Sequence, residues 1–280
     1  MEQRSAAWHE MRKDKIGASD APVIMKKSPW KTPYQLWREK LGLVDEQGST
    51  FAMDRGNELE PVAKRALEEK LGMALQPQIR LHNQRSWMMA SMDAVSLDNR
   101  TVAEIKCPGK DDHATALAGH VPEKYYPQLQ HQMEVCGVDE LYYFSYHGDE
   151  NALLRIARDE KYIKQLLIEE EKFYECVMNF EPPELTANDY VWQDSAKWAK
   201  LAQDYKDLLE LEDKRESIKQ QLIELASGKN SRGGGIQLTR CMRKGAIDYK
   251  KIPQLQDVDL ELYRKHSSEY WRITLPEKPK

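Results

Sequence analysis

Cysteine is scarce in this chain, and the few cysteines present do not form pairs. There are four among 280 residues, and no two have the short spacing that a zinc site or a redox motif requires. The histidines lack metal-site spacing as well. We therefore expect reduced thiols in a cytoplasmic protein, without a cysteine-bound iron–sulfur cluster. The cysteines are Cys107, Cys136, Cys176 and Cys241.

Long apolar runs and a strong charge of one sign are also missing. No apolar stretch reaches the length of a membrane-spanning helix, and the first residues lack the basic-then-apolar pattern of a signal peptide. The formal net charge of −4 argues mildly against a surface covered with phosphate contacts. Positive charge nevertheless clusters between Lys229 and Lys251, where Asp248 is the only acid. A local basic surface is therefore compatible with this composition.

Capping signals and apolar periodicity predict alternating helices and strands. Thr32 and Pro33 open one helix, and Pro61 is expected in the first turn of another that ends at Gly72. This order is typical of an α/β fold. The predicted helices are 6–13, a short one after Ser19-Asp20, one from Thr32, 58–71, 127–136 and 163–180. The predicted strands pass through Ile79, 87–97, 101–107, 141–146 and 153–157.

Pro182-Pro183 marks a boundary, so we predict a core over 1–185 and an accessory region over 190–280. The accessory region begins with an amphipathic helix over 195–226. Packing of this helix on its own chain is favoured over a coiled coil because Arg215 interrupts the apolar seam. After a run of three glycines, strands 236–241 and 246–249 should flank a basic tip at Arg243-Lys244-Gly245, and a last strand covers 270–275.

The most informative segment is a predicted hairpin with an acid on one strand and Glu-x-Lys on the other. Asp98-Asn99 is a turn signal between the strands, so a hairpin closing there brings Asp93 alongside Glu104. Because side chains alternate along a strand, Glu104 and Lys106 share one face. Residues 103, 105 and 107 then point into the core.

These three side chains suit metal-assisted cleavage of a phosphodiester. The carboxylates of Asp93 and Glu104 are hard ligands for Mg²⁺ or Mn²⁺, which would lower the pKa of a bound water and neutralise phosphoryl charge. Lys106 would orient that water or steady the developing charge. The alternative is an exposed hairpin with a cross-strand salt bridge, because acid-x-Lys triplets are common when 31% of residues are charged.

Ordered short motifs surround this hairpin. They are Trp8-x-x-x-Arg12 with Ile16-Gly17-Ala18-Ser19-Asp20, Ser28-Pro29-Trp30 with Thr32-Pro33 and Leu36-Trp37, Arg55-Gly56-Asn57-Glu58-Leu59-Glu60, Ser91-Met92-Asp93 with Glu104-Ile105-Lys106, and Tyr125-x-x-Gln128-x-Gln130-x-Gln132. Together they resemble the lambda-type phage exonucleases, also called the YqaJ-like viral recombinase family, over about residues 5–180. Met92 departs from the broader pattern, which often has proline before the acid; this is a backbone preference and leaves the predicted site unchanged.

The resemblance implies a restriction-endonuclease-like fold: a mixed central sheet flanked by helices, here with a C-terminal helical and β-hairpin extension. It implies a Mg²⁺-dependent 5′→3′ exonuclease of linear double-stranded DNA, which leaves a 3′ single strand for phage-type recombination in the cytoplasm of a bacterial host. It also implies a ring-shaped homotrimer and a single-strand annealing protein as partner. A structure- or sequence-specific endonuclease with the same core, and an inactive DNA-end-binding scaffold, are the alternatives.

The resemblance also assigns metal ligands beyond Asp93 and Glu104. Glu60 corresponds to a helix carboxylate at the metal, and Ile105 supplies a backbone carbonyl. Glu58 competes with Glu60, but residues two apart on a helix face different ways. The alternative for either acid is a solvated first-turn residue favoured by the helix dipole.

A pocket for a DNA 5′-phosphate is implied at Arg12 and Ser19, with Ser91 as a further hydroxyl. A permanently charged guanidinium and donors at a helix N-terminus suit a phosphate. The alternative is that Ser19 only caps its helix and that Arg12 pairs with Glu10 or Asp14.

The last motif places Tyr125 and Gln128 at the site. Gln128 is expected to bond the attacking water or Lys106, and Pro127 leaves Tyr125 just outside the helix. Gln130 and Gln132 are expected at the surface or facing DNA. Three tryptophans are expected in the core, with the first considered as a wedge at a DNA end: Trp30, Trp37 and Trp87.

Overall fold

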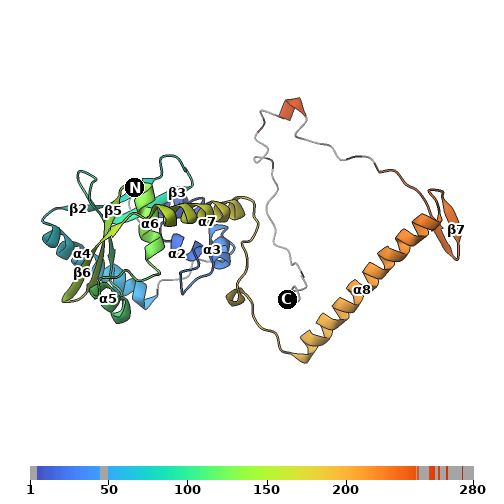
Figure 1. The fold of residues 1–280 in the computed structure, drawn as a ribbon, viewed down its shortest axis with the longest axis horizontal. Helices are drawn as coiled ribbons and strands as arrows, with labels where there is room; N and C mark the ends of the chain where they lie inside the picture. Colours follow the sequence, from blue (N-terminus) through green and yellow to red (C-terminus); the bar gives the residue numbers. More distant parts are fainter. Residues whose placement is uncertain are drawn as a thin grey trace. The chain divides into compact units, whose positions relative to one another are not determined.

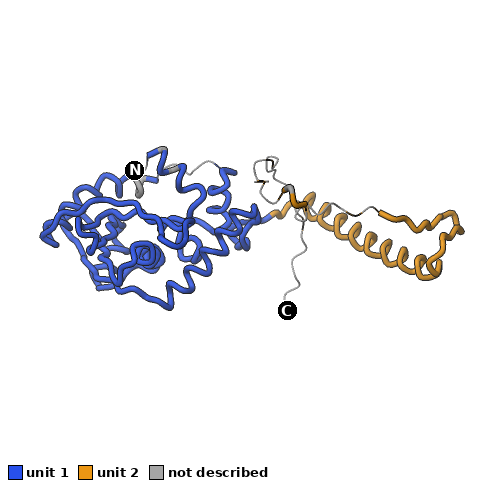
Figure 2. Tube along the Cα trace, turned by 90° about the horizontal axis from the view of Figure 1, so that it is seen from above, with its two compact units in different colours: residues 1–192 blue, residues 193–280 orange. Residues whose placement is uncertain are grey.

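The computed structural model describes residues 5–44, 50–243, 245, 252–255, 258, 263 and 273. The chain divides into two compact units, Met1–Trp192 and Gln193–Lys280, which Figure 2 distinguishes by colour. Among the helices that the structure describes, none combines the length and the apolar character needed to cross a bilayer.

The first unit is built on a six-stranded mixed sheet with strand order β1-β3-β4-β5-β6, in which β2 also pairs with β3 (Figure 1). Strands β2 and β4 run antiparallel to β3, whereas β1 is parallel to β3 and β4 is parallel to β5. The strands are β1 (Ile16–Gly17), β2 (Leu75–Leu81), β3 (Met88–Ser96), β4 (Val102–Lys106), β5 (Glu140–His147) and β6 (Glu150–Ala157). The predicted mixed sheet of an α/β fold is confirmed.

Seven helices of this unit flank the sheet within the described residues, and two of them cover its opposite faces. Helix α6 packs Leu129 and Met133 against one face, and α4 packs Ala63 and Leu67 against the other. All four of these side chains are fully buried. The helices are α1 (Ala6–Lys13), α2 (Ala21–Ile24), α3 (Pro33–Lys40), α4 (Phe51–Leu71), α5 (Lys110–Leu117), α6 (Tyr126–Cys136) and α7 (Glu160–Met178).

The centre of β3 is irregular. Gln76 of β2 pairs with Val95, whereas Gln78 pairs with Met92, so β3 contains one more residue than β2 over this step. This β-bulge includes Asp93. A bulge redirects a side chain and bends its strand, which is why bulges are common beside active sites.

The predicted hairpin is present. Strand β3 ends at Ser96 and β4 begins at Val102, and Asn99 adopts a left-handed φ of 62° in the turn, a conformation that asparagine tolerates better than most residues. Ala103 and Ile105 are buried against α4, with Cys107 packed beside them. The period-2 alternation predicted for β4 is therefore confirmed.

The prediction that Pro61 lies in a first turn is wrong. Helix α4 begins at Phe51, so Pro61 lies inside it. Proline has no N–H, so the carbonyl of Asn57, four residues earlier, loses its helical hydrogen bond. Close packing of Ala63 and Leu67 on the sheet offsets this cost. Helix α5 was missed because its weakly periodic sequence, from Lys110 to Leu117, carries little helical signal.

The second unit contains α8 (Ala196–Leu225), β7 (Ser231–Gly233) and β8 (Ile236–Leu238). The predicted long helix is confirmed, but none of its residues is buried. A hairpin that the sequence did not predict is present, in which β8 pairs with β7 across Gly234 and Gly235, both at positive φ. These glycines adopt the turn at no steric cost. Residues 246–249, and all of 270–275 except residue 273, lie outside the described residues.

Candidate active site

The candidate site lies where β3 and β4 separate. Backbone pairing between these strands includes Val95 with Val102 and Ala94 with Ala103. The next residues on the two strands are Asp93 and Glu104. At this step the backbone N–H of Ile105 donates to Oδ2 of Asp93 at 3.0 Å. The Asp93 carboxylate thus accepts a hydrogen bond from the backbone of β4, and this bond holds Asp93 beside Glu104.

Two glutamines of α6 hold Glu104 from above the sheet. Gln128 Nε2 donates to Oε1 of Glu104, and Gln132 Nε2 donates to Oε2, each at 2.5 Å. Residues four apart lie on one helical face, which explains why both amides reach the same carboxylate. Gln132 Nε2 also lies 3.3 Å from the carbonyl oxygen of Ser91. Glu104 is 1% exposed, so these donors replace the water it would otherwise bind.

Lys106 completes a compact polar cluster. Its Nζ lies 2.6 Å from Oε1 of Glu104 and 5.5 Å from the ring centre of Tyr125. Burial lowers the pKa of Lys106, but the nearby carboxylates of Glu104 and Asp93 outweigh burial and raise the pKa above its ordinary value, so the amine stays charged. Burial raises the pKa of Tyr125 to about 12, against the opposing effect of Lys106, so its hydroxyl stays protonated.

Glu60 also belongs to this cluster, whereas Glu58 does not. Burial first, then Glu104, raises the pKa of Asp93 well above its usual range, and Glu60 contributes in the same direction. Burial first, and Glu60 next, raises the pKa of Cys107 to about 11. Glu60 therefore affects the pKa of Asp93 on β3 and that of Cys107, the residue after β4. Glu58 is exposed, as expected for its other direction on α4.

The three carboxylates suit a divalent cation chemically. Within the described residues, no three acidic, histidine or cysteine side chains already form a metal-binding group; Lys106 and the glutamines engage Glu104 instead. Burial first, and then repulsion from Glu104 and Glu60, raises the pKa of Asp93, and a cation would relieve the repulsion. Oε1 of Gln132 is buried and, in the described structure, has no hydrogen-bond partner. This oxygen is an acceptor suited to a metal-bound water.

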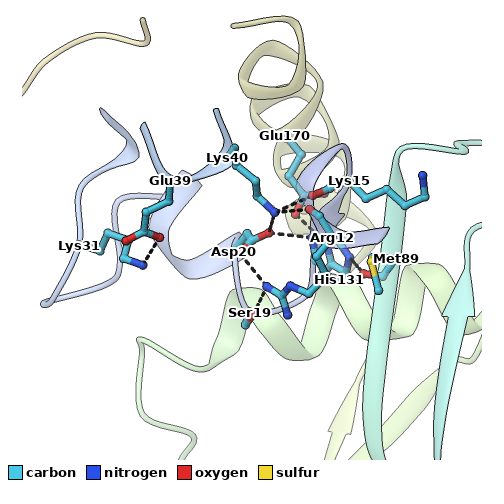
Figure 3. Close-up of polar contacts among 11 residues, drawn as sticks. Arg12, Lys15, Ser19, Asp20, Lys31, Glu39, Lys40, Met89, His131 and Glu170 are labelled. Atoms are coloured by element: carbon cyan, nitrogen blue, oxygen red, sulfur yellow. Dashed lines mark hydrogen bonds and ion pairs between the residues drawn. The ribbon is translucent and has the colours of Figure 1, made fainter. Parts of the chain in front are cut away.

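The predicted phosphate ligands lie together. Arg12 donates from Nη2 to the hydroxyl of Ser19 at 3.0 Å, as Figure 3 shows. The guanidinium carbon of Arg12 lies 4.6 Å from the ring centre of Trp8, and Nε1 of Trp8 donates to the Ser91 hydroxyl at 3.0 Å. Trp8 therefore links the Arg12–Ser19 pair to β3, two residues from Asp93.

Neither alternative for this pocket describes the structure. Glu10 pairs with Lys13, and Asp14 pairs with Lys15. Ser19 precedes the N-cap of α2, which is Asp20. Its hydroxyl accepts from Arg12 instead of capping the helix. Helix α2 has a single turn, so its dipole contributes little to the pocket.

Asp20 and Lys40 form a buried support beneath Arg12 that the sequence motifs did not indicate (Figure 3). Asp20 accepts from Arg12 at 3.1 Å and from the Gly17 N–H at 2.9 Å, and it lies 2.7 Å from Lys40 Nζ. Lys40 also donates to the carbonyl oxygens of Arg12 and Lys15. Burial raises the pKa of Asp20, but Lys40 and Arg12 lower it to about 2.

A second buried pair joins α6 to α7 and β3. His131 Nδ1 lies 2.7 Å from Oε1 of Glu170, and Nε2 lies 2.8 Å from the carbonyl oxygen of Met89 (Figure 3). Both ring nitrogens face acceptors, so the ring carries two protons and a positive charge. Burial lowers the pKa of His131, but the Glu170 carboxylate raises it and dominates.

Two predictions about α6 and the tryptophans are wrong. Gln130 and Gln132 are buried because α6 is covered on most sides, so they are not surface residues. Gln130 bridges the Ala157 carbonyl and the Asp159 N–H. Gln128 donates to Glu104, and its bond to the attacking water or to Lys106 stays a prediction. Trp30 is 68% exposed and lies outside the core, whereas Trp37 is buried and Trp87 packs against the core as predicted.

Comparisons with known proteins agree with this arrangement. The model of the YqaJ-like viral recombinase domain matches residues 7–139. The uncharacterized protein YqaJ of Bacillus subtilis (strain 168) is 27% identical over 173 residues, which are 60% of this chain and 54% of that protein. The chain thus spans about half the length of this curated relative.

Solved structures give the same relationship. The alkaline exonuclease LHK-Exo from Laribacter hongkongensis is 26% identical, with a TM-score of 0.55, over 63% of this chain and 94% of that one. Its complex with dAMP gives 27% identity and a TM-score of 0.56 over the same shares. Residues 7–139 therefore match the YqaJ-like viral recombinase domain, and the first unit has the restriction-endonuclease-like fold of the lambda-type exonucleases.

Proposed function

We propose that this protein is a divalent-metal-dependent exonuclease that degrades one strand of linear double-stranded DNA from a 5′-phosphorylated end. One observation carries the proposal: the Asp93–Glu104–Lys106 cluster lies on the same strand pair as Ser91, which Trp8 joins to Arg12 and Ser19. A cutting centre and an anion-binding group are thus connected by a single tryptophan.

In this proposal Asp93, Glu104, Glu60 and the Ile105 carbonyl hold Mg²⁺. The bound ion would supply Lewis-acid stabilisation of the phosphoryl oxygens and a more acidic water. The other side chains keep the carboxylates in place. Gln128 and Gln132 fix the plane of the Glu104 carboxylate, in the way that outer hydrogen-bond partners orient metal ligands.

Lys106 acts as a fixed cation at the scissile group. Its amine stays protonated beside Glu104 and Asp93, so it stabilises negative charge that develops on the phosphate and orients the attacking water. The Tyr125 ring lies over the same amine and limits its movement. A lysine with this role is needed for turnover but not for folding.

The 5′ preference follows from the group around Arg12. Guanidinium is permanently charged and forms strong bonds to phosphate oxygens, and Asp20 already aims it at Ser19. A terminal phosphate carries more charge and more free oxygens than an internal phosphodiester. We therefore expect an end with a 5′-phosphate to bind better than an end with a 5′-hydroxyl.

The proposal is tested with linear duplexes that carry either 5′ end and are labelled separately at each terminus. We expect nucleotide release from the labelled 5′-phosphate end, only with Mg²⁺, and loss of release in Lys106→Ala with the fold intact. Rapid cutting of covalently closed circles would instead support an endonuclease. Release that is equally fast in Lys106→Ala would refute the site.

Two further proposals rest on the family resemblance alone. The protein forms a homotrimeric ring around DNA, and it hands the 3′ single strand to an annealing protein. A closed ring would explain processive cutting by a chain with a net charge of −4, because enclosure replaces many phosphate contacts. Light scattering of the purified protein measures the first, and co-purification with a phage-type annealing protein measures the second.

A further inference from the structure

Trp30 is an aromatic side chain whose position the proposed chemistry does not yet explain. It lies in the loop between α2 and α3 and is 68% exposed, whereas Trp37, seven residues later, is 7% exposed. Exposing an indole forfeits the large stabilisation that burial of an aromatic ring provides. A single exposed aromatic is ordinary on a protein surface, so its neighbours decide whether it has a role.

The neighbours connect Trp30 to the candidate active site. Lys124 Nζ lies 4.7 Å from the Trp30 ring centre and 5.4 Å from that of Tyr125. On the other side of Tyr125 is Lys106, whose amine lies 5.5 Å from the same ring and 2.6 Å from Glu104. Rings and cations therefore alternate from the buried carboxylate out to the exposed indole.

Asp112 of α5 holds Lys124 in this position. Its amine lies 2.6 Å from Oδ2 of Asp112 on α5, and the Tyr125 hydroxyl donates to the same oxygen at 3.5 Å. The Lys124 side chain is 20% exposed, so its aliphatic part is largely covered while Trp30 stays accessible. The result is an exposed indole that has a fixed positive charge over its ring.

We propose that Trp30 and Lys124 form a stacking surface for the unpaired base of the terminal nucleotide. This rests on the proposed function, because only a nuclease that acts at DNA ends brings such a base here. Glu104 is fully buried between β4 and α6, so a terminal phosphodiester reaches the cluster only if its nucleotide leaves the duplex. An indole stacks on any base, and the lysine attracts the backbone.

The test measures how the indole and the base depend on each other. Binding is followed in the Lys106→Ala background, so that the DNA is not consumed, with 2-aminopurine as the 5′-terminal base. Trp30→Ala should weaken binding about 5- to 150-fold, the range measured for loss of one base–aromatic stack, and it should reduce quenching of the 2-aminopurine. Trp30→Phe should retain most of both signals. Trp192→Ala, which removes an 89% exposed tryptophan of the same unit, is the matched control and should change neither.

The decisive comparison uses an abasic 5′-terminal nucleotide with its phosphate intact. The protein that retains Trp30 should bind this abasic substrate as weakly as Trp30→Ala binds the end with a terminal base. Trp30→Ala should cause no further loss of affinity for the abasic substrate. An equal effect of Trp30→Ala on both ends would overturn the stacking surface, because the indole would then not recognise a base. No effect on either end would overturn it as well.

These outcomes are separable from failure of the proposed function. If the unmodified protein releases no nucleotides from linear DNA, the nuclease proposal fails. If it releases them at the same KM and kcat as Trp30→Ala, only the stacking surface fails. Lys124→Met gives an independent check, since it should raise KM with a smaller effect on the quenching than Trp30→Ala.

Discussion

Replacing Lys40 with methionine should destabilise the first unit far more than any surface lysine replacement. The Lys40 and Asp20 side chains are each 7% exposed, and their charged atoms lie 2.7 Å apart. Lys40 also donates to two carbonyl oxygens in and after the last turn of α1. Methionine fills similar volume but supplies no donor, so the change removes charge while largely preserving packing.

The size of the effect depends on the charged groups that remain after Lys40 is replaced. Loss of one partner of a buried ion pair typically costs about 3–5 kcal/mol, because the other charge is left without compensation. Asp20 would keep Arg12 at 3.1 Å and the Gly17 N–H at 2.9 Å. We therefore expect a loss near the lower end, about 3 kcal/mol in the free energy of unfolding.

Lys31 provides the matched control, since it is another lysine in an ion pair, here with Glu39 of α3 (Figure 3). Its partner Glu39 lies 2.5 Å away, but the two side chains are 26% and 16% exposed. Lys31→Met should cost about 1 kcal/mol or less. Urea unfolding followed by tryptophan fluorescence measures both variants.

A double variant sharpens the prediction. Adding Asp20→Asn to Lys40→Met removes the buried carboxylate that has lost its Lys40 partner, so part of the lost stability should return. The 5′-phosphate preference should fall in both, because Arg12 loses its support. Equal losses in Lys40→Met and Lys31→Met would refute the argument, since burial would then make no difference to the two ion pairs.

Three further predictions concern α6 and the metal. Gln132→Leu should lower nucleotide release about tenfold or more by freeing the Glu104 carboxylate. Gln130→Leu is the control, and it should lower stability but leave the activity of the folded enzyme unchanged. Equal kcat values for the two variants would contradict the role of Gln132. The pKa of His131 lies above its ordinary value of 6.5 in the folded protein, so its stabilising pair with Glu170 is complete below pH 6.5 and weakens as pH rises through the folded pKa. The free energy of unfolding, measured across pH, should fall over that range, and Glu170→Gln should abolish the fall. Chelation by EDTA should stop nucleotide release and added Mg²⁺ should restore it, whereas release without divalent ions would contradict metal dependence.

The core of the candidate site could be predicted because its determinants are local. Asp93, Glu104 and Lys106 lie within 14 consecutive residues, and the strand period and the turn at Asn99 place them without reference to other elements. Glu60, Gln128 and Tyr125 required the family motifs, since no local rule brings a helix to a given strand.

The other features of the candidate site depend on contacts between segments that are distant in the sequence. The support of Arg12 by Lys40 spans 28 residues, and the contact between Gln132 and Glu104 also spans 28. A glutamine on a helix gives no sequence signal of whether its face will be covered, and so Gln130 and Gln132 were predicted at the surface. Pro61 likewise favoured a helix start, although packing of α4 on the sheet outweighed it.

Turn preferences and side-chain alternation act over a few residues, so the strand pair and the chemistry of its three polar side chains could be predicted locally. The donors that hold Glu104, the support of Arg12 and the exposure of Trp30 beside Lys124 depend instead on how distant segments pack. Burial and ion pairing depend on what the whole fold brings together.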